Sequence, residues 1–348
     1  VSREHVLREL QWHCAGRGIR NKGETCFVNA VAQVLLRGGP IRRVHEAHLQ
    51  GRCPRGGLRC PVCALAAQAD ALSVQGDGAD QEAPLSVAAR DGVFSMQQFR
   101  AGQCDADEFF GHALQALGAM EGQTYGGRCA VEQHIFGIFT RNRTFCEKCN
   151  FVQDAGEIQN MFLVDMQQVC SRREDVVDLQ DLLRRQIQLV DRIDFACPAH
   201  AHLSDAERVA RNLCRGGFEA TTKHAFFDRL PPVLFVTVRR AFGPDPHHQS
   251  YDRRRVRFPQ TLTPEEGGCD YDFSGVVVHV PGAGARPSVH SGHYIAFGVV
   301  GENQYACFDD TRVRTLPWRQ FAYSEQSQRG AYVFAYLRSA GARADEVG

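Results

Sequence analysis

The sequence predicts an α+β fold in which a helical lobe precedes a β-rich lobe along the chain. Apolar residues recur at helical spacing in the first third, short strand-like segments begin at Gly126, and apolar runs typical of buried strands follow residue 230. The chain has 348 residues, of which 43% are apolar, so it is long enough for one large domain or two ordinary ones. A cleft between two such lobes is a natural position for an active site.

Two early segments carry the helical pattern. Residues 26 to 37 place apolar side chains on one face, and Gly38 to Pro40 then end the helix. Residues 105 to 120 repeat the pattern. Between these helices, residues 72 to 92 are rich in Gly, Asp and Ala, and we expect a surface loop there.

The middle and the end of the chain add helices and strands. We expect a helix over residues 175 to 190, and another that begins at Ser204 and ends near residue 216. The stretch Ser-Asp-Ala-Glu predicts a capping box between Ser204 and Glu207. Apolar runs that predict buried strands cover residues 230 to 240 and 275 to 280.

Bulk composition excludes several function classes. The 40 basic and 40 acidic residues cancel, so no global field favours nucleic acid or an anionic membrane, and we see no apolar run approaching ~18 residues. Several of the 14 Cys lie in Cys-x-x-Cys pairs, which favour metal binding over disulfides. We find no secretory signal and expect an intracellular, reducing compartment. The first residue is Val1, as expected of an excerpt from a longer protein.

The segment GIRNKGETCFVNA places Cys26 at the end of a Gly-containing loop and at the start of a helix. The helix N-terminus favours negative charge on a thiolate, so Cys26 is a candidate nucleophile. Asn21 on the same loop is a candidate side-chain donor to an oxyanion, beside the Cys26 backbone N–H. The alternative is that Cys26 is a buried packing thiol.

The segment SGHYIAFGVVGENQYACFDD predicts a β-hairpin that supplies a base. If the turn centres on Gly301, His293 and Asp309 face each other; if it centres one residue later, they are diagonal neighbours. In either register Asp309 can orient the His293 imidazole by a hydrogen bond. Gly292 leaves room for a substrate backbone.

Four blocks of the chain resemble the ubiquitin-specific proteases. The first segment resembles their Cys box, GLxNxGNTCYMN, and SGHYIAF with FDD resembles their His box. GQCDADEFF resembles their QQDAxEFL segment, and LPPVLFVTVRRAF resembles their LPxVLxxxLKRF strand. The blocks follow the family's order from Gly18 to Asp310, so the resemblance covers most of the chain.

The resemblance implies a role for each matching residue. Cys26 would be the nucleophile, His293 the base and Asp309 the group that orients it. Asn21 would donate to the oxyanion, and Asp310 would be a second carboxylate that assists polarisation. The segment that lines the ubiquitin tail in relatives matches Gln103, Asp105 and Glu108. The alternatives are an ordinary acidic first turn of a helix for the two acids, and a surface position for Gln103.

The resemblance also implies a papain-like cysteine protease fold shaped as a right hand. We expect one catalytic domain with a thumb over residues 1–125, zinc-bearing fingers and part of the palm over 126–230, a β-rich palm over 231–338 and a loose tail over 339–348. The implied reaction is hydrolysis of the bond after the C-terminal Gly of ubiquitin through a thioester. The expected partners are ubiquitin and ubiquitinated proteins, bound by a monomeric domain. Alternatives are a non-cleaving ubiquitin-binding scaffold, or a hydrolase for another ubiquitin-like modifier.

Three positions depart from the family pattern. Glu24 stands where the family usually has Asn, and an inward carboxylate there would disfavour a thiolate on Cys26. Val28 replaces Met, which is a mild change, and Tyr305 replaces the Trp before FDD. All three triad residues are present, so we expect an active enzyme.

Two groups of Cys and His predict structural zinc (Zn²⁺) sites. The pair Cys146 and Cys149 is followed 48 residues later by Cys-Pro-Ala-His, which offers Cys197 and His200 as the second pair. Relatives carry zinc in their fingers on two such pairs, and His202 or Cys214 could replace a ligand. The second group comprises His48, Cys53, Cys60 and Cys63. Plain thiols are the alternative in both groups.

Overall fold

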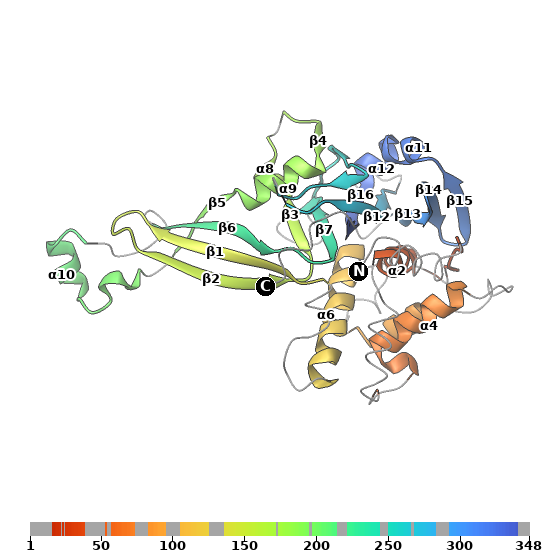
Figure 1. Ribbon diagram of the computed structural model, residues 1–348, viewed down its shortest axis with the longest axis horizontal. Coiled ribbons are helices and arrows are strands. Elements are labelled where there is room, and N and C mark those ends of the chain that lie inside the picture. The colour runs from red at the N-terminus through yellow and green to blue at the C-terminus, as the bar shows by residue number, and fades with distance from the viewer. Residues whose placement is uncertain are drawn as a thin grey trace.

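The computed structural model shows a mixed α/β body from which a long β arm projects (Figure 1). The residues that it describes are 16–21, 23, 25–38, 53, 57–73, 83–94, 105–124, 136–171, 173–194, 197–213, 221–243, 250–265, 268–282 and 292–339. The predictions made for Glu24, Gln103, His48, Cys214 and the tail from residue 340 lie outside these residues. Within them, no helix has both the length and the apolar character that crossing a bilayer needs.

Two early helices form where helical spacing predicts them, namely α2 (Cys26–Gly38) and α6 (Ala106–Thr124). The structure adds three that the spacing does not predict, namely η1 (Gly57–Arg59), α4 (Pro61–Ser73) and α5 (Pro84–Arg90). The prediction of a surface loop over residues 72–92 is wrong at α5. This short helix begins with Pro84, whose fixed φ suits a first helical position, and it buries Leu85 and Ala88 in the core.

A central sheet of eight strands forms the body (Figure 1). Its strands run in the order β15-β14-β13-β12-β16-β7-β3, and β11 pairs with β12. Their bounds are β3 Phe162–Asp165, β7 Val233–Arg239, β11 Thr261–Leu262, β12 Tyr271–Val280, β13 His293–Gly301, β14 Gln304–Asp309, β15 Arg312–Leu316 and β16 Ala331–Arg338. The predicted apolar strands are confirmed in β7 and β12.

Two apolar cores cover the sheet. One joins α2, α4, α5 and α6 to residues such as Phe235 and Tyr294, and the other joins helix α9 (Leu179–Ile187) to residues such as Val236 and Ile295. Neighbouring residues of one strand therefore point into different cores, as the alternation of a β-strand requires. Helix α2, with Cys26 at its start, lies against β13 and β12.

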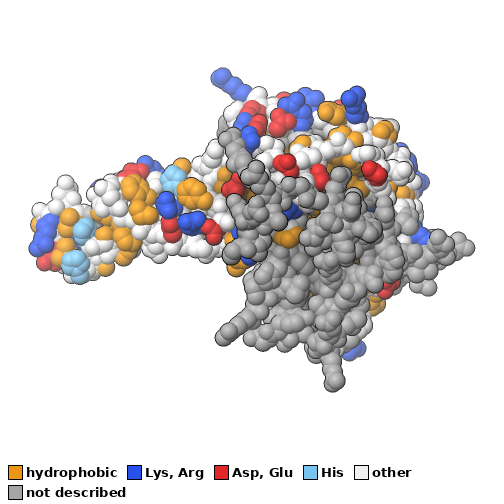
Figure 2. Space-filling model, viewed as in Figure 1, with side chains coloured by type: hydrophobic (Ala, Val, Ile, Leu, Met, Phe, Trp, Pro, Cys, Tyr) orange, Lys and Arg blue, Asp and Glu red, His pale blue; other side chains and the backbone are white. Residues whose placement is uncertain are grey.

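The arm, which projects from the body in the space-filling view of Figure 2, is a second sheet with strand order β2-β1-β6-β5 (Figure 1). Its strands are β1 Ile138–Cys146, β2 Val152–Gln159, β5 Val190–Arg192 and β6 Thr221–Arg229. The pairing registers place four exposed apolar side chains on one face of it, namely Val152, Ile158, Val190 and Phe226. We call these four residues the apolar arm face.

Beyond β5 the chain forms η4 (Pro198–His200) and helix α10 (Asp205–Ala210), which Figure 1 shows at the end of the arm. The predicted capping box is confirmed: Ser204 Oγ accepts from the Glu207 N–H at 3.3 Å, and Glu207 Oε2 accepts from the Ser204 N–H at 2.9 Å. The helix ends at Ala210, earlier than predicted.

Shorter elements lie in the connections between the strands. They are α8 (Met166–Val169), β4 (Val176–Asp178), β8 (Ala241–Phe242), β9 (Ser250–Tyr251), β10 (Arg255–Arg257), α11 (Trp318–Ala322) and α12 (Glu325–Gly330). The helix predicted over residues 175–190 is therefore only partly correct. Its first residues form β4, which pairs in parallel with β10, and α9 follows directly.

Candidate active site

Cys26 is the first residue of α2, and its side chain is almost fully covered. The loop before it is shaped by Asn21, whose Oδ1 accepts hydrogen bonds from the Gly23 N–H at 3.1 Å and the Thr25 N–H at 3.2 Å. The Thr25 hydroxyl donates to the same oxygen at 3.1 Å. The Asn21 side chain therefore fixes the loop that leads into the helix, and Cys26 stands where backbone N–H groups have no partner within the helix.

The hairpin of β13 and β14 brings a base and a carboxylate together. Phe297 pairs with Cys307, so the turn centres one residue after Gly301. The second of the two predicted registers is therefore correct, and His293 and Asp309 are diagonal neighbours. His293 Nε2 lies 2.7 Å from Asp309 Oδ1, a charge-assisted hydrogen bond when the ring is protonated.

The structure also brings Cys26 to His293. A hydrogen bond with Cys26 is the largest cause that raises the pKa of His293 to about 9; burial opposes the rise, and the Asp309 hydrogen bond adds to it. Because Asp309 occupies Nε2, Nδ1 is the ring nitrogen left for the sulfur. An imidazolium between a sulfur and a carboxylate is the arrangement of a thiol hydrolase.

Asp310 joins three segments of this site. Its Oδ2 accepts from Asn21 Nδ2 at 3.0 Å, and its Oδ1 accepts from Asn29 Nδ2 at 2.8 Å. Its backbone φ is 51°, a left-handed conformation that lets its carbonyl accept the Ile19 N–H at 2.9 Å. A Cβ on Gly18 would lie 2.2 Å from the same carbonyl oxygen, so this approach needs glycine.

Asn29 is a site residue that sequence reasoning missed. It is 3% exposed and lies one turn after Cys26 on α2. Its presence in the Cys-box segment was the available signal, but its partner Asp310 lies 281 residues away and nothing local points to the contact.

Gly292 has a φ of +114° directly before His293. A Cβ there would lie 2.4 Å from the Val280 carbonyl oxygen and 2.8 Å from the Gly282 nitrogen. The chain's own strands thus require glycine at this position. The expectation that Gly292 also leaves room for a substrate stays a prediction.

The first turn of α6 carries the acids predicted to bind a substrate tail. Asp105 accepts from the Asp107 N–H at 3.0 Å, from the Tyr332 hydroxyl at 2.7 Å and from the Tyr294 hydroxyl at 3.4 Å. Burial raises the pKa of Asp105 to about 6, and burial together with the neighbouring Asp105 raises the pKa of Asp107 to about 7. Asp105 therefore already fixes α6 to β13 and β16, while Glu108 lies partly exposed on the same turn.

Three thiols meet near the end of the arm. The sulfurs of Cys146, Cys149 and Cys197 lie within 4.8 Å of one another, with Cys149 and Cys197 at 3.2 Å. Burial, followed by the neighbouring thiols, raises the pKa of Cys197 to about 12. The three thiols would lose their protons only on binding a cation. Two sulfurs bound to one tetrahedral zinc at ~2.3 Å lie roughly 3.8 Å apart, so the group fits zinc after a small adjustment. His200 is outside this close group, and its role as the fourth ligand stays a prediction.

A second thiol group lies beside α4. Cys53, Cys60 and Cys63 have their sulfurs within 4.8 Å of one another, and Cys63 and Cys53 are 3.8 Å apart. That spacing matches a tetrahedral zinc site. Burial, with the two neighbouring thiols, raises the pKa of Cys63 to about 12.

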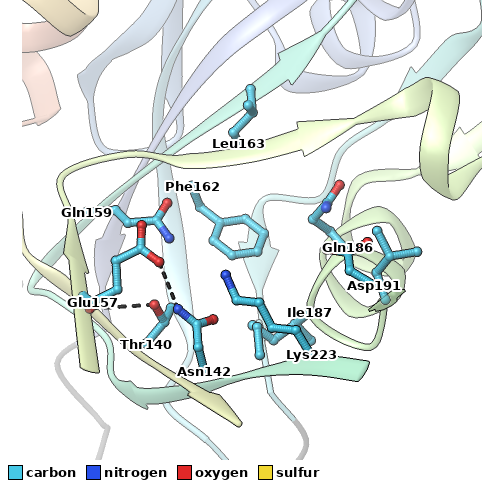
Figure 3. Close-up of a pocket in the computed structure, with 12 residues that line it drawn as sticks. Thr140, Asn142, Glu157, Gln159, Phe162, Leu163, Gln186, Ile187, Asp191 and Lys223 are labelled. Atoms are coloured by element: carbon cyan, nitrogen blue, oxygen red, sulfur yellow. Dashed lines mark hydrogen bonds between the residues drawn. The ribbon is translucent and has the colours of Figure 1, made fainter. Parts of the chain in front are cut away.

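A cavity of about 150 Å³ lies at the root of the arm, away from these groups (Figure 3). Its walls come from β1, β2, β3, β6 and the end of α9, and Figure 3 shows Lys223 directed between Asn142 and Phe162. The alternation along β1 and β6 puts Asn142 and Lys223 on the face opposite the apolar arm face. None of the predicted catalytic residues lines this cavity.

Comparison with protein families decides the identity of the chain. The family model described as ubiquitin carboxyl-terminal hydrolase matches residues 17–336. The chain belongs to this family. Ubiquitin carboxyl-terminal hydrolase 23 of Arabidopsis thaliana is 25% identical over 342 residues, which are 93% of this chain and 35% of the plant protein. Ubiquitin carboxyl-terminal hydrolase 17-like protein D of Mus musculus is 24% identical over 349 residues, 94% of this chain and 56% of the mouse protein.

Solved structures share the fold. The SAGA DUB module Ubp8(C146A)/Sgf11/Sus1/Sgf73 bound to monoubiquitin contains a chain that matches with a TM-score of 0.70 and 18% identity, over 95% of this protein and 70% of that chain. The same module bound to ubiquitin aldehyde matches with a TM-score of 0.69 and 19% identity, over 94% and 70% of the two chains. The predicted α+β fold of ubiquitin-specific proteases is thereby confirmed. This hydrolase-family chain spans only part of the length of its curated relatives.

Proposed function

We propose that this member of the ubiquitin carboxyl-terminal hydrolase family is a cysteine-type deubiquitinase. It would hydrolyse the peptide or isopeptide bond after the C-terminal Gly of ubiquitin. The observation that carries the proposal is the line of contacts from Cys26 through His293 to Asp309, built at the start of a helix. A nucleophile, a base and an orienting group in hydrogen-bond contact are the requirement for thiol hydrolysis.

The first step is attack by the Cys26 thiolate on the carbonyl carbon after which the chain is cut. The proton from sulfur resides on His293, whose imidazolium is stabilised below about pH 9 by Cys26 and Asp309. The carbonyl oxygen becomes an oxyanion, and we assign Asn21 Nδ2 and the Cys26 backbone N–H as its donors. One hydrogen of Asn21 Nδ2 is used by Asp310, and the other remains for the oxyanion.

Collapse of that intermediate breaks the bond to the leaving amine, which takes the proton from His293. The product is a thioester between Cys26 and the C-terminal Gly. His293 then removes a proton from water, the hydroxide attacks the thioester, and the thiolate leaves. Asp309 keeps Nδ1 directed at the reacting atoms throughout, because it holds Nε2 at 2.7 Å.

Ubiquitin as substrate is supported by two surfaces. The segment that matches the family's tail-binding block carries Glu108 on α6, and a carboxylate suits a basic tail by charge-assisted hydrogen bonds. The apolar arm face would contact the body of the same substrate through its four exposed apolar side chains, with charged neighbours such as Arg141 and Arg143 on the same face of the sheet. Asp105, which the chain's own tyrosines already engage, would act more by holding α6 than by touching the tail; Gln103 keeps its predicted role.

We further propose that both thiol groups hold structural zinc. Cys146, Cys149 and Cys197 would share one ion with His200, or with the alternative ligands His202 and Cys214. Cys53, Cys60 and Cys63 would share another with His48. Zinc bound by four protein ligands leaves no position for water, so it would stabilise the fold and take no part in the reaction.

The decisive experiment uses ubiquitin with a fluorogenic C-terminal leaving group. We expect turnover by the wild type, none by Cys26→Ala, and near-normal turnover by Cys170→Ser, a matched control at a partly buried cysteine outside the site. Ubiquitin with a C-terminal alkyne should label Cys26, as mapped by peptide mass spectrometry. Labelling of another thiol would contradict the proposal.

The same assays separate the alternatives. Tight ubiquitin binding without turnover would indicate a non-cleaving ubiquitin-binding module. Reaction with the electrophile of a different ubiquitin-like modifier, and not with that of ubiquitin, would indicate another substrate. The monomeric state, the domain limits and the intracellular location stay predictions; size-exclusion chromatography with light scattering tests the first of them.

A further inference from the structure

Both amide hydrogens of Asn29 are donated to residues of the site. Nδ2 donates to Asp310 Oδ1 at 2.8 Å and to the Ile19 carbonyl oxygen at 3.3 Å. These two acceptors lie on the turn after β14 and on the loop before α2. Asn29 thus ties three segments together one turn after the nucleophile.

The orientation of this amide is fixed by its surroundings. If the amide were flipped, its oxygen would lie 2.8 Å from a carboxylate oxygen, which is repulsive, so the nitrogen must face Asp310. Asn29 Oδ1 is buried and has no hydrogen-bond partner among the described residues. A buried acceptor without a partner costs free energy, and an apolar side chain would fill the same space without that cost. Packing alone does not explain an asparagine here.

The Asp310 carboxylate links Asn29 to Asn21, because it accepts a hydrogen bond from each of the two amides. One oxygen is held by Asn29, and the other accepts from Asn21 Nδ2 at 3.0 Å. The Asn21 oxygen is held separately, by the N–H groups of Gly23 and Thr25. The plane of the Asn21 amide is therefore fixed from both ends, and Asn29 supplies the support at the end that carries the donor.

We propose that Asn29 is a positioning residue of the oxyanion site: it fixes Asp310, and through Asp310 it aims the Asn21 amide at the developing oxyanion. This inference rests on the proposed hydrolase function. Asn29 would not touch the substrate. Its effect would appear where negative charge develops on the carbonyl oxygen, and not in ubiquitin binding.

The test is a double-mutant cycle between Asn29→Ala and Asn21→Ala. Removal of one oxyanion donor costs on the order of 10²–10³ in kcat. Asn29→Ala leaves the other end of the Asn21 amide held, so we expect a smaller loss of about tenfold in kcat, with KM within about twofold. In the Asn21→Ala background the same substitution should cost less than about twofold, because the donor that it aims is already absent.

Gln33→Ala is the matched control. Gln33 is 2% exposed, lies one turn further along α2, and donates to the Arg17 carbonyl oxygen at 2.8 Å, so it also ties the helix to the preceding loop. It makes no contact with Asp310 among the described residues. Gln33→Ala should lower the thermal midpoint of unfolding. In the double variant with Asn21→Ala, the fold-loss in kcat should equal the product of the losses in the two single variants.

A second readout separates the oxyanion from the nucleophile. Addition of the Cys26 thiolate to a ubiquitin C-terminal alkyne forms a vinyl thioether, with the proton going to the terminal carbon and no carbonyl oxyanion. We expect Asn29→Ala to keep this labelling rate within about threefold while hydrolysis falls about tenfold. Equal loss of labelling and hydrolysis, or full multiplication with Asn21→Ala, would overturn the proposal.

Failure of the proposed function looks different. If the wild type neither hydrolyses nor is labelled by ubiquitin reagents, the hydrolase assignment fails and this inference fails with it. If the wild type is active and Asn29→Ala is equally active, only this inference fails. Should Asn29→Ala not fold, Asn29→Ser keeps a small polar side chain that is too short to reach Asp310, and the same outcomes apply.

Discussion

Asp107→Asn should stabilise the protein, and more so as the pH rises. Asp107 lies in the first turn of α6, and its Oδ1 is buried with no hydrogen-bond partner among the described residues. Burial and the neighbouring Asp105 raise its pKa from 3.8 to about 7. The folded protein therefore binds this proton more tightly than the unfolded chain does.

The sign follows from proton linkage. Because the folded pKa is raised, the proton stabilises the fold, and this stabilisation is lost as the pH rises from about 4 to about 7. A rise of ~3 pKa units corresponds to about 4 kcal/mol between the fully protonated and the fully ionised limits. Asp107 is only partly covered as a whole residue, so we expect water to halve the penalty, to about 2 kcal/mol above pH 8 and about 1 kcal/mol near pH 5.

Urea unfolding at about pH 5 and about pH 8 measures this difference. Asp107→Asn should be more stable than the wild type at both values, and its advantage should grow by about 1 kcal/mol between them. Glu108→Gln is the control, because Glu108 lies in the same turn and this substitution removes the same charge. An advantage of Asp107→Asn that is independent of pH, or that shrinks as the pH rises, would refute the reasoning.

Three further predictions concern the site and the thiol groups. The kcat/KM of the wild type should fall on the alkaline side near pH 9 as His293 loses its proton, and Asp309→Asn should move this limb to lower pH; an unmoved limb in a stopped assay across pH 6–10 would contradict the assignment. Gly18→Ala should lower kcat at least tenfold with ubiquitin binding kept, because its methyl group would collide with the Asp310 carbonyl; calorimetry on the Cys26→Ala background measures the binding. Cys149→Ser should remove about one zinc per chain by elemental mass spectrometry and lower the thermal midpoint while kcat at low temperature stays within about twofold; unchanged metal content would argue against the site.

Sequence patterns predict those parts of this fold that are determined locally. Helix α2 and the capping box of α10 follow from residues a few positions apart, and both form as predicted. The β13–β14 hairpin is predicted as an element, but two registers satisfy the pattern. The turn geometry selects between them, and the observed pairing of Phe297 with Cys307 shows which register forms.

Contacts between distant segments are what sequence patterns leave open. In the sequence, Asn29 resembles any buried helix residue, and its contact with Asp310, which is 281 residues away, is visible only in the structure. Asp105 resembles a substrate-binding acid at a helix N-terminus until Tyr294 and Tyr332 are seen to engage it. The Gly, Asp and Ala content of residues 72–92 predicts a loop, yet helix α5 forms there because its apolar side chains are buried by tertiary contacts.

The turn after β14 explains how Cys26 and His293, the proposed nucleophile and base, can meet although they lie far apart in the sequence. Asp309 faces His293, and the next residue, Asp310, takes a left-handed conformation that turns its carboxylate toward α2 and its carbonyl toward Ile19. One pair of adjacent acids thus contacts His293, the proposed base, and the loop that carries Asn21, the proposed oxyanion donor. Gly18 has no side chain to collide with that carbonyl, so the loop can approach the hairpin closely, and in the structure Cys26 lies within hydrogen-bond contact of His293. If Cys26 and His293 act as proposed, a side chain at Gly18 should disturb their reaction through this contact, which is what the Gly18→Ala prediction tests.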